Sequence, residues 1–441
     1  MGKHMTTISA RTLPDARKEM WLCHFPASPR GADDVCRRPG GPFKAHGFSL
    51  VELMVAMALG LLLTVAMGSV YFSSRTAFSR QQQLGSIQQS VRIAFEYLRD
   101  DARMVGHMGC YTGLPLTAPS FNSALSTTTL ASNYAVGVEG YEYTNATAGA
   151  YTLDSNAPAE VTAAGNWTTN TAGGTSNTIS VATIAGTGNG LTPGSDVLVI
   201  RTVSGRPVRL AANANVAASQ AAFTIETVAG STDKCNNGTT AKVSGFCATS
   251  HGLIASCTQA RVFQVSAITA GVAPAASTLT LSSSMGTDPQ YVTAGTEVFP
   301  MQTIIYYVKK SSSGTSTSLY RRTFDGDRKD PSGTVAQGQE QELIEGVENL
   351  QVKYGVELAA TPNGIVANYV TANAVTDWSL VVAVRMGLVI RSTVPVEADV
   401  SVAAAASSVN GVAVTYPTTG SKYDRRVFTT TVAVRNRIAY F

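Results

Sequence analysis

The longest run of uncharged residues extends from Leu53 to Phe72, LMVAMALGLLLTVAMGSVYF, and contains no proline. As an α-helix, twenty residues extend about 30 Å, which is the thickness of a bilayer's hydrocarbon core. The leucines, valines and phenylalanine of the run favour insertion by roughly 3 to 5 kcal/mol in sum. A helix in the core of a soluble domain rarely lacks a polar face over this length. The run therefore predicts a membrane-spanning helix.

Glu52 stands directly before this run. A carboxylate at the bilayer centre costs about 2.5 to 3.5 kcal/mol, and less near the end of a span, so insertion remains favourable. The carboxylate either reaches the headgroup region or pairs with a cationic group. Acids inside membranes usually have such a partner. The residue that supplies the cation is not evident from charge patterns alone.

The segment GFSLVEL, residues 47–53, resembles the class III signal of type IV prepilins. In that family a membrane-embedded prepilin peptidase cuts after the glycine that matches Gly47. The new N-terminus, which matches Phe48, is N-methylated, and the glutamate that matches Glu52 pairs with the terminal amine of a neighbouring subunit. An ordinary secretory signal, cut near residues 65–68, is the competing interpretation. The apolar run is longer than the seven to fifteen residues of such signals.

Four small side chains recur at every fourth position of the span and share one helix face: Ala56, Gly60, Thr64 and Gly68. Small residues at this spacing let membrane helices approach closely, which predicts a packing face against neighbouring pilin helices. The same spacing also arises from the ordinary frequency of Gly and Ala in membrane helices. Both interpretations stay open.

From residue 73 to about 107 the pattern becomes that of an amphipathic helix, with apolar residues at steps of three or four. Gly106 and Gly109 mark its end. The last third of the chain carries the best strand patterns, at 343–356, 378–391 and 425–435, and a hairpin pairs 302–310 with 318–324. The expected fold is a pilin-like α+β fold, in which one long helix packs on an antiparallel sheet with a large β-rich insert.

Five segments are expected. Residues 1–47 form a cytoplasmic leader that is removed, 48–72 the membrane or filament-core helix, and 73–110 its amphipathic half. Residues 111–300 form a variable region rich in Ser, Thr and Gly, and 301–441 the C-terminal antiparallel sheet.

The positive charge of the chain lies in the leader. Eight of the 33 basic and four of the 29 acidic residues fall within 1–47, so 25 of each remain after cleavage. Positive charge before a span keeps that end in the cytoplasm, which places the C-terminal bulk in the periplasm of an inner-membrane, single-pass protein. A net charge near zero also argues against a nucleic-acid partner.

Six cysteines are present, and Cys23 and Cys36 leave with the leader. An even count in an exported chain indicates two disulfides, with three connectivities to choose from. The hairpin-sized spacing favours Cys235–Cys247, which leaves Cys110 for Cys257. Zinc is the weaker alternative because only two histidines remain beyond the leader and no CxxC motif exists.

Three late segments, at 346–356, 382–391 and 425–436, look like C-terminal signatures of the PilW minor pilins, and 256–265 is similar to another PilW segment. The resemblance implies a low-abundance subunit of the type IV pilus. In that family, other minor pilins of the V, X, E and FimT/FimU types, the major pilin and a PilY-type tip adhesin are partners. The minor pilins and the PilY-type adhesin form a priming complex that caps the pilus tip on the cell surface and starts polymerisation.

Five arginines of these late segments are candidate interface cations: Arg385, Arg391, Arg425, Arg426 and Arg435. The alternative is that they alternate with core residues and lie on the solvent face of their strands. The solvent face is the commoner place for an arginine in a strand.

No enzyme motif is evident. The chain contains neither a GxSxG nucleophile elbow nor a GxxxxGK[ST] phosphate loop, and no cofactor or metal is expected. Two other functions remain open. One is a type II secretion minor pseudopilin of the J class, although those proteins are usually shorter. The other is an adhesive module of the pilus tip carried by the variable region, since Ser/Thr/Asn-rich loops can contact host surfaces.

Overall fold

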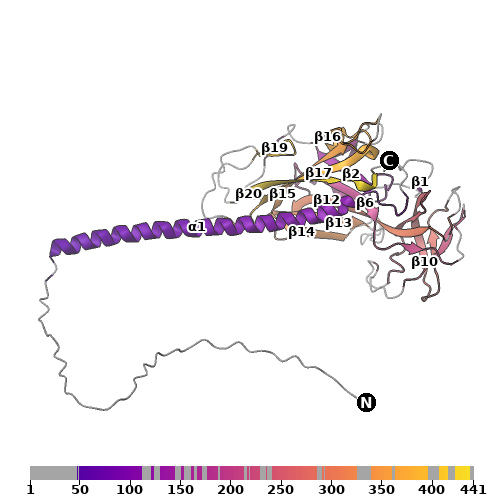
Figure 1. Cartoon of the computed structure of the whole chain (residues 1–441), viewed down its shortest axis with the longest axis horizontal. Coiled ribbons are helices and arrows are strands. Elements are labelled where there is room, and N and C mark those ends of the chain that lie inside the picture. Colours follow the sequence, from indigo (N-terminus) through magenta and orange to yellow (C-terminus); the bar gives the residue numbers. More distant parts are fainter. Residues whose placement is uncertain are drawn as a thin grey trace, which may run out of the picture. The chain divides into compact units, whose positions relative to one another are not determined.

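A computed structural model of the chain shows one long helix followed by a largely antiparallel β region (Figure 1). The α+β class expected from the sequence is confirmed. The leader lies outside the described residues, which are 47, 49–111, 121–123, 130–144, 150–152, 160–162, 166–170, 176–186, 189–212, 216–217, 219–228, 235, 241–285, 291–292, 294–324, 339–359, 363–395, 407–415 and 423–437.

Helix α1 (Leu50–Arg103) runs without interruption for 54 residues, because its sequence contains no proline. Just beyond the helix, Gly106 adopts a φ of 67° and Gly109 a φ of 65°, a conformation that glycine enters at no steric cost. The Asn436 side chain donates hydrogen bonds to the carbonyls of Arg103 and Val105 at 3.3 and 3.2 Å. The helix therefore ends where the glycines predicted, and its last carbonyls are satisfied by the C-terminal region.

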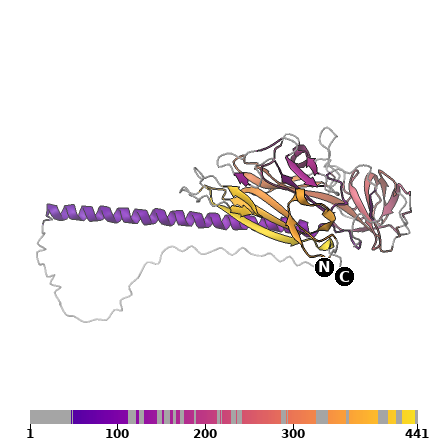
Figure 2. The ribbon, with the colours of Figure 1, turned by 90° about the horizontal axis from the view of Figure 1, so that it is seen from above.

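A four-stranded antiparallel sheet comes from the C-terminal part of the chain. Its strand order is β16-β15-β17-β20. Figure 2 shows the yellow C-terminal strands alongside the end of α1. The strands are β15 (Val347–Val356), β16 (Asn368–Val370), β17 (Val381–Arg391) and β20 (Arg425–Ala433).

The larger sheet has thirteen strands and runs in the order β5-β4-β2-β6-β12-β9-β10-β11-β8, with β1, β7, β13 and β14 branching from it. Its pairs are antiparallel except for β1 with β10. The strands are β1 (Phe121–Ser123), β2 (Val138–Tyr143), β4 (Trp167–Asn170), β5 (Ser176–Ile179), β6 (Val197–Val203), β7 (Val208–Arg209), β8 (Ala222–Ile225), β9 (His251–Ala255), β10 (Ala260–Thr269), β11 (Ser277–Leu281), β12 (Glu297–Lys310), β13 (Thr317–Phe324) and β14 (Gln339–Glu345).

Strand β12 crosses the boundary that was expected at residue 300. It pairs with β6 and β7 on one side, and with β9 and then β13, in the predicted hairpin, on the other. The region before residue 300 therefore shares one sheet with the start of the C-terminal region. The remaining elements are a small sheet of β18 (Ser407–Val409), β19 (Val412–Thr415) and β3 (Ala150–Thr152), helix α2 (Val181–Ala185), and the 3₁₀ turns η1 (Ala372–Ala374), η2 (Trp378–Leu380) and η3 (Arg435–Arg437).

Two strands differ from the sequence prediction. The segment 343–356 was predicted as one strand, but Gly346, with a φ of 93°, divides it into β14 and β15, which belong to different sheets. A side chain at this position would place its Cβ 2.7 Å from the carbonyl oxygen of Arg391. At 378–391, the first residues form η2, because Asp377 accepts a hydrogen bond from the backbone N–H of Ser379 at 2.8 Å.

The main hydrophobic core joins α1 to both large sheets. One face of the amphipathic half of α1 is buried against apolar side chains of β6, β12, β15 and β17. The spacing of three and four residues places these helix side chains on one side. They are Ile87, Val91, Ala94, Phe95, Leu98, Ala102 and Val105.

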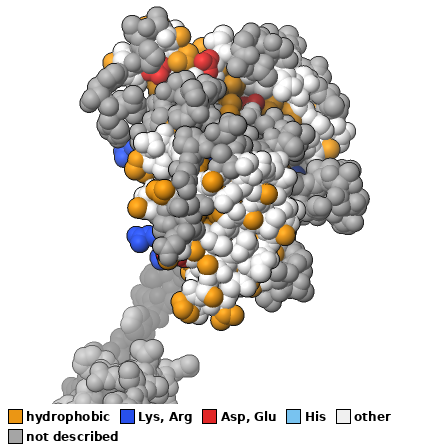
Figure 3. Space-filling view, turned by 90° about the vertical axis from the view of Figure 1, so that its right-hand side faces the viewer, with side chains coloured by type: hydrophobic (Ala, Val, Ile, Leu, Met, Phe, Trp, Pro, Cys, Tyr) orange, Lys and Arg blue, Asp and Glu red, His pale blue; other side chains and the backbone are white. Residues whose placement is uncertain are grey.

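A separate core lies between β8, β9, β10 and β11 and includes Phe223, Phe246 and Phe263. The rings of Phe223 and Phe263 meet edge to face, with their centroids 5.3 Å apart. On the face of the molecule shown in Figure 3, polar and apolar side chains are mixed and few are charged. This agrees with a chain of which only 14% is charged.

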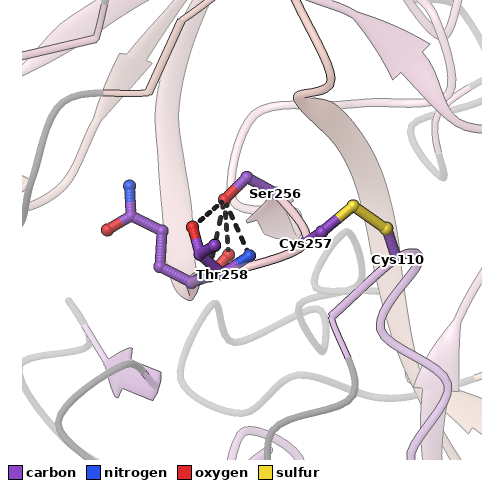
Figure 4. Close-up of a disulfide and its surroundings, with 5 residues drawn as sticks. Cys110, Ser256, Cys257 and Thr258 are labelled. Carbon is purple, nitrogen blue, oxygen red and sulfur yellow. Dashed lines mark hydrogen bonds between the residues drawn. A yellow bond between two sulfur atoms is a disulfide. The ribbon is translucent and has the colours of Figure 1, made fainter.

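Two disulfides join Cys110 to Cys257 and Cys235 to Cys247, which is the connectivity preferred from the sequence. The first ties the segment directly after α1 to the β9–β10 turn (Figure 4). In that turn the Ser256 hydroxyl accepts hydrogen bonds from the backbone N–H groups of Thr258 and Gln259. The end of the helix is therefore covalently bound to the larger sheet.

The two disulfides differ in the loops they close, with sequence separations of 147 and 12 residues. In the chain-entropy model, replacing Cys110 and Cys257 by serine lowers the free energy of unfolding by about 5 kcal/mol, and replacing Cys235 and Cys247 by about 3 kcal/mol. Urea denaturation of the two double variants, with wild type as reference, measures both losses. Equal losses, or a larger loss from the short loop, would contradict this ranking.

Candidate functional site

The predicted processing and assembly residues lie at the start of α1. Gly47 and Ser49 are exposed and precede the helix, and the backbone N–H of Leu53 donates the first helical hydrogen bond to the carbonyl of Ser49 at 3.0 Å. Glu52 is in the first turn and exposed, where an acid interacts favourably with the helix dipole. Phe48 lies outside the described residues. The arrangement leaves the Glu52 carboxylate open to another molecule.

None of the residues that the structure describes covers the apolar part of α1. Every large apolar side chain from Leu50 to Phe72 is between 50% and 75% exposed. The helix is long and apolar enough to cross a membrane. An exposed apolar surface of this size is stable only in lipid or against other proteins.

The small residues of the span lie along one side of α1. Ala56, Gly60 and Thr64 are exposed, and Gly68 is half-buried. A Cβ added at Gly60 or Gly68 would meet no atom within 4 Å. The Thr64 hydroxyl donates to the carbonyl of Leu61 at 2.8 Å, so its polar group is satisfied within the helix. This side is accordingly open to a second helix.

The other half of α1 is held to the sheets by a polar contact that the sequence did not indicate. The guanidinium of Arg321 donates to both carboxylate oxygens of Asp101, at 2.8 and 3.3 Å, and the Tyr306 hydroxyl donates to the same carboxylate. Burial lowers the pKa of Arg321, but the hydrogen bond and charge of Asp101 outweigh it and raise the pKa overall. Burial, reinforced by Asp101, raises the pKa of Tyr306. Arg99 adds a contact to the Thr430 hydroxyl at 2.9 Å.

Two of the five arginine candidates are neither interface cations nor solvent-facing residues. Arg425 and Arg391 are directly opposite each other in β20 and β17, and both are buried. Arg425 binds the buried carboxylate of Glu348 with two hydrogen bonds, at 2.7 and 2.9 Å, and Arg391 lies 3.7 Å from it. For Arg391 and Arg425, both the interface and the solvent-face interpretations were wrong. The buried carboxylate of Glu348 neutralises positive charge that would otherwise have to stay in water.

The other three arginines lie nearer to the surface. Arg385 is half-buried and stacks over the ring of Tyr369, with its guanidinium carbon 3.7 Å from the ring centroid. Arg426 and Arg435 are exposed, as the solvent-face interpretation expected. Only these two present their charge fully to solvent.

A pair of buried acids lies where the two large sheets meet. The Asp196 carboxylate accepts a hydrogen bond from the backbone N–H of Val352 at 2.8 Å, while its other oxygen and one oxygen of Glu142 have no partner. Burial raises the pKa of Glu142 to about 7. Burial and the charge of Glu142 raise the pKa of Asp196 well above its usual range. The pair therefore holds at least one proton at neutral pH.

No local sequence pattern indicated these buried polar contacts. Asp101, Glu348 and Asp196 stand among ordinary helix and strand residues, and the partner of each is 150 or more residues away along the chain or comes from another strand. In the described part of the chain, no three His, Cys, Asp or Glu side chains are placed to hold a metal ion.

Two family models match the chain. Residues 42–68 match the prokaryotic N-terminal methylation motif, and residues 305–436 match the type IV pilus-assembly protein W family, PilW. No curated protein and no solved structure matches the chain.

The methylation motif and the long apolar helix are features of membrane-anchored, prepilin-like proteins. The C-terminal match then identifies a PilW region, and together the two matches support a minor pilin role in the type IV pilus. PilW is a family of structural pilus-assembly proteins, not of enzymes. The PilW match begins within β12 and includes the whole four-stranded sheet.

The Glu142 carboxyl makes the stability of the protein depend on pH. Because its pKa is about 7 when folded and about 4.3 in an unfolded chain, folding retains a proton, and stability falls as pH rises through this interval. Glu142→Gln removes the effect, so the variant exceeds wild type in stability at pH 8 by on the order of 3 kcal/mol and matches it near pH 4. Urea denaturation at pH 4, 6 and 8 measures the difference. A constant difference across pH would contradict this assignment.

Proposed function

We propose that this protein is a minor pilin that is stored in the inner membrane through α1 and then joins the priming complex at the pilus tip. The observation that carries the proposal is the exposed Glu52 in the first turn of an apolar helix whose large side chains no described part of the chain covers. The C-terminal domain would lie in the periplasm, because the positive charge precedes the span.

The proposed polymerisation contact joins Glu52 to the amine of Phe48 on a neighbouring subunit. Cleavage after Gly47 creates this amine, and methylation leaves it cationic. Each charge is costly in an apolar environment, and their pairing offsets much of that cost. Subunits would therefore associate where the two groups meet, which fixes the axial position of one helix against the next.

The side of α1 that carries Ala56, Gly60, Thr64 and Gly68 supports the same mechanism. Helices in lipid gain no hydrophobic energy from association, so close approach and van der Waals packing must stabilise it. The open space at Gly60 and Gly68 leaves room for a neighbouring helix backbone. We assign this side to helix packing in the complex.

The PilW match favours the pilus over a type II secretion pseudopilus, since the matched family is one of pilus assembly. The partners proposed are the other minor pilins of the V, X, E and FimT/FimU types, the major pilin and a PilY-type adhesin. The prepilin peptidase acts on the chain at Gly47. The variable region is assigned no adhesive role.

Glu52→Ala is expected to leave membrane insertion intact, because removal of an acid lowers the cost of insertion. Its amount in sheared pili should fall at least about tenfold, corresponding to the loss of roughly 1.4 kcal/mol or more from an ion pair in an apolar setting. Immunoblots of membrane and sheared-pilus fractions measure both amounts.

Two further variants control for size and for general loss of charge. Glu52→Gln keeps the shape and should fail like Glu52→Ala. Glu96→Gln changes an exposed acid of the same helix beyond the span and should assemble like wild type. Wild-type amounts of Glu52→Gln in sheared pili would refute the pairing.

Mass spectrometry of the exported protein is expected to find N-methylated Phe48 as the first residue. Gly47→Val should block this cleavage, because the family's peptidase cuts after the glycine that Gly47 matches. Gly85→Ala, within α1 at a position where an added Cβ meets no atom within 4 Å, should be processed normally. A mature chain that begins beyond Met67 would indicate an ordinary secretory signal instead.

A further inference from the structure

The last strand of the four-stranded sheet has a neighbour on one side only. Strand β20 pairs with β17 over nine residues without a bulge. Within the described residues, no strand lies on its other side. The backbone N–H of Val434 donates to the carbonyl of Val382, and that of Ser392 to the carbonyl of Asp424. The even-numbered residues of β20 therefore point their backbone groups toward β17, and the odd-numbered residues point theirs outward.

Four residues thus offer outward backbone groups: Val427, Thr429, Thr431 and Ala433. In the described part of the chain these groups make no hydrogen bond. The side chains of Thr429, Thr431 and Ala433 are exposed as well. Eight unpaired donors and acceptors in a row form a template for a further strand.

Native edge strands usually carry features that prevent such pairing, such as proline, lysine, a bulge or a very short length. Strand β20 has none of them, and its centre, Val427-Phe428-Thr429-Thr430-Thr431-Val432, consists of residues that favour strands. Its inner face is fixed, because Thr430 contacts Arg99 of α1 and Val432 belongs to the main core. The outer edge of β20 is therefore held in an extended conformation before any partner strand binds.

We propose that this edge accepts an extended strand from another pilus subunit, which adds a fifth strand to the sheet; the identity of the occupant rests on the proposed function. The charge pattern defines the occupant. Arg426, 55% exposed on its side chain and 3.7 Å from the Asp424 carboxylate, and the exposed Arg435 flank an uncharged centre. At the start of the strand, the acids Glu348 and Asp424 offset two of the three cations Arg391, Arg425 and Arg426, so one positive charge remains. A matching strand has about seven β-branched or apolar residues without proline and an acid at each end.

A second copy of this chain fits the edge less well. If two β20 strands overlapped fully in antiparallel order, Val434 of one copy would lie opposite Arg426 of the other. Arg435 of each copy would then stand beside Arg425 and Arg426 of its partner, a group that keeps one positive charge because Glu348 and Asp424 offset only two of its three cations, Arg391 included. Like charges placed opposite each other across strands are destabilising. Charge complementarity therefore favours a different subunit with acidic ends.

A photo-crosslinking amino acid placed at 429 or 431 of the full chain in piliated cells tests the proposal. We expect crosslinks to an acid-flanked segment of a second protein that carries the N-terminal methylation motif, identified by mass spectrometry of the crosslinked peptide. The matched control is position 178, an exposed threonine of the edge strand β5. Crosslinks no stronger than at 178, or only to a second copy of this chain, would overturn the proposal.

Substitutions at the edge separate backbone pairing from side-chain contact. Thr429→Pro removes an outward N–H without touching the bonds to β17 and should lower the crosslink yield from 431 at least about fivefold. Thr429→Ala keeps the N–H and should change it less than about twofold. Arg435→Glu lies outside the strand and should also lower the yield, through repulsion of the acidic end. Equal yields from Thr429→Pro and Thr429→Ala would overturn strand addition.

Two measurements distinguish the absence of the edge contact from misfolding of a variant and from failure of the proposed pilin function. Non-reducing electrophoresis shows whether the Pro variant still forms both disulfides; if it does not, Arg435→Glu alone decides, and an unchanged yield then refutes the proposal. The Glu52→Gln variant reports on the pilin function by itself. Loss of assembly with Glu52→Gln, together with no crosslink at 429 or 431, would reject the edge contact and leave the minor pilin role standing.

Discussion

The rest of the structure depends on one constraint, which is that the first half of α1 exposes its entire apolar surface. Among the described residues, none covers these side chains, so lipid or another protein must do so. Consequently only the second half of α1 packs against the sheets. The buried stripe from Ile87 to Val105, the Asp101–Arg321 contact and the covalent link at Cys110 all act on that half. The first half is left available for assembly.

Strand β12 connects the two parts of the β region. Its pairing with β13 belongs to the segment that matches PilW, whereas its pairing with β6 and β9 joins residues outside that match. The four-stranded sheet, entirely within the match, packs against α1 through the same core. The chain thus combines a pilin-like unit with additional strands that extend one sheet, rather than with a separate domain after a linker.

Much of this architecture follows from local sequence. The period of α1, the glycines that end it, the β12–β13 hairpin and the strands near 260, 350, 385 and 430 are all visible as patterns over a few residues. The break between β14 and β15 at Gly346 was not visible in the sequence, because a single glycine in a strand-like run does not reveal that its φ is positive. The buried ion pair at Glu348 was missed for a related reason. Whether an arginine in an alternating strand faces water depends on a carboxylate from another strand, which periodicity cannot indicate.

The covalent link between Cys110 and Cys257 has a mechanical consequence. A tensile load that enters the protein along α1 reaches residue 110 directly, and the disulfide passes it to the β9–β10 turn, which is 147 residues further along the chain. The load thus bypasses most of the hydrogen bonds of the large sheet, which would otherwise be sheared one after another. Even if the packing of α1 on its strands were pulled apart, the segment directly after the helix would stay attached to the β9–β10 turn by a covalent bond.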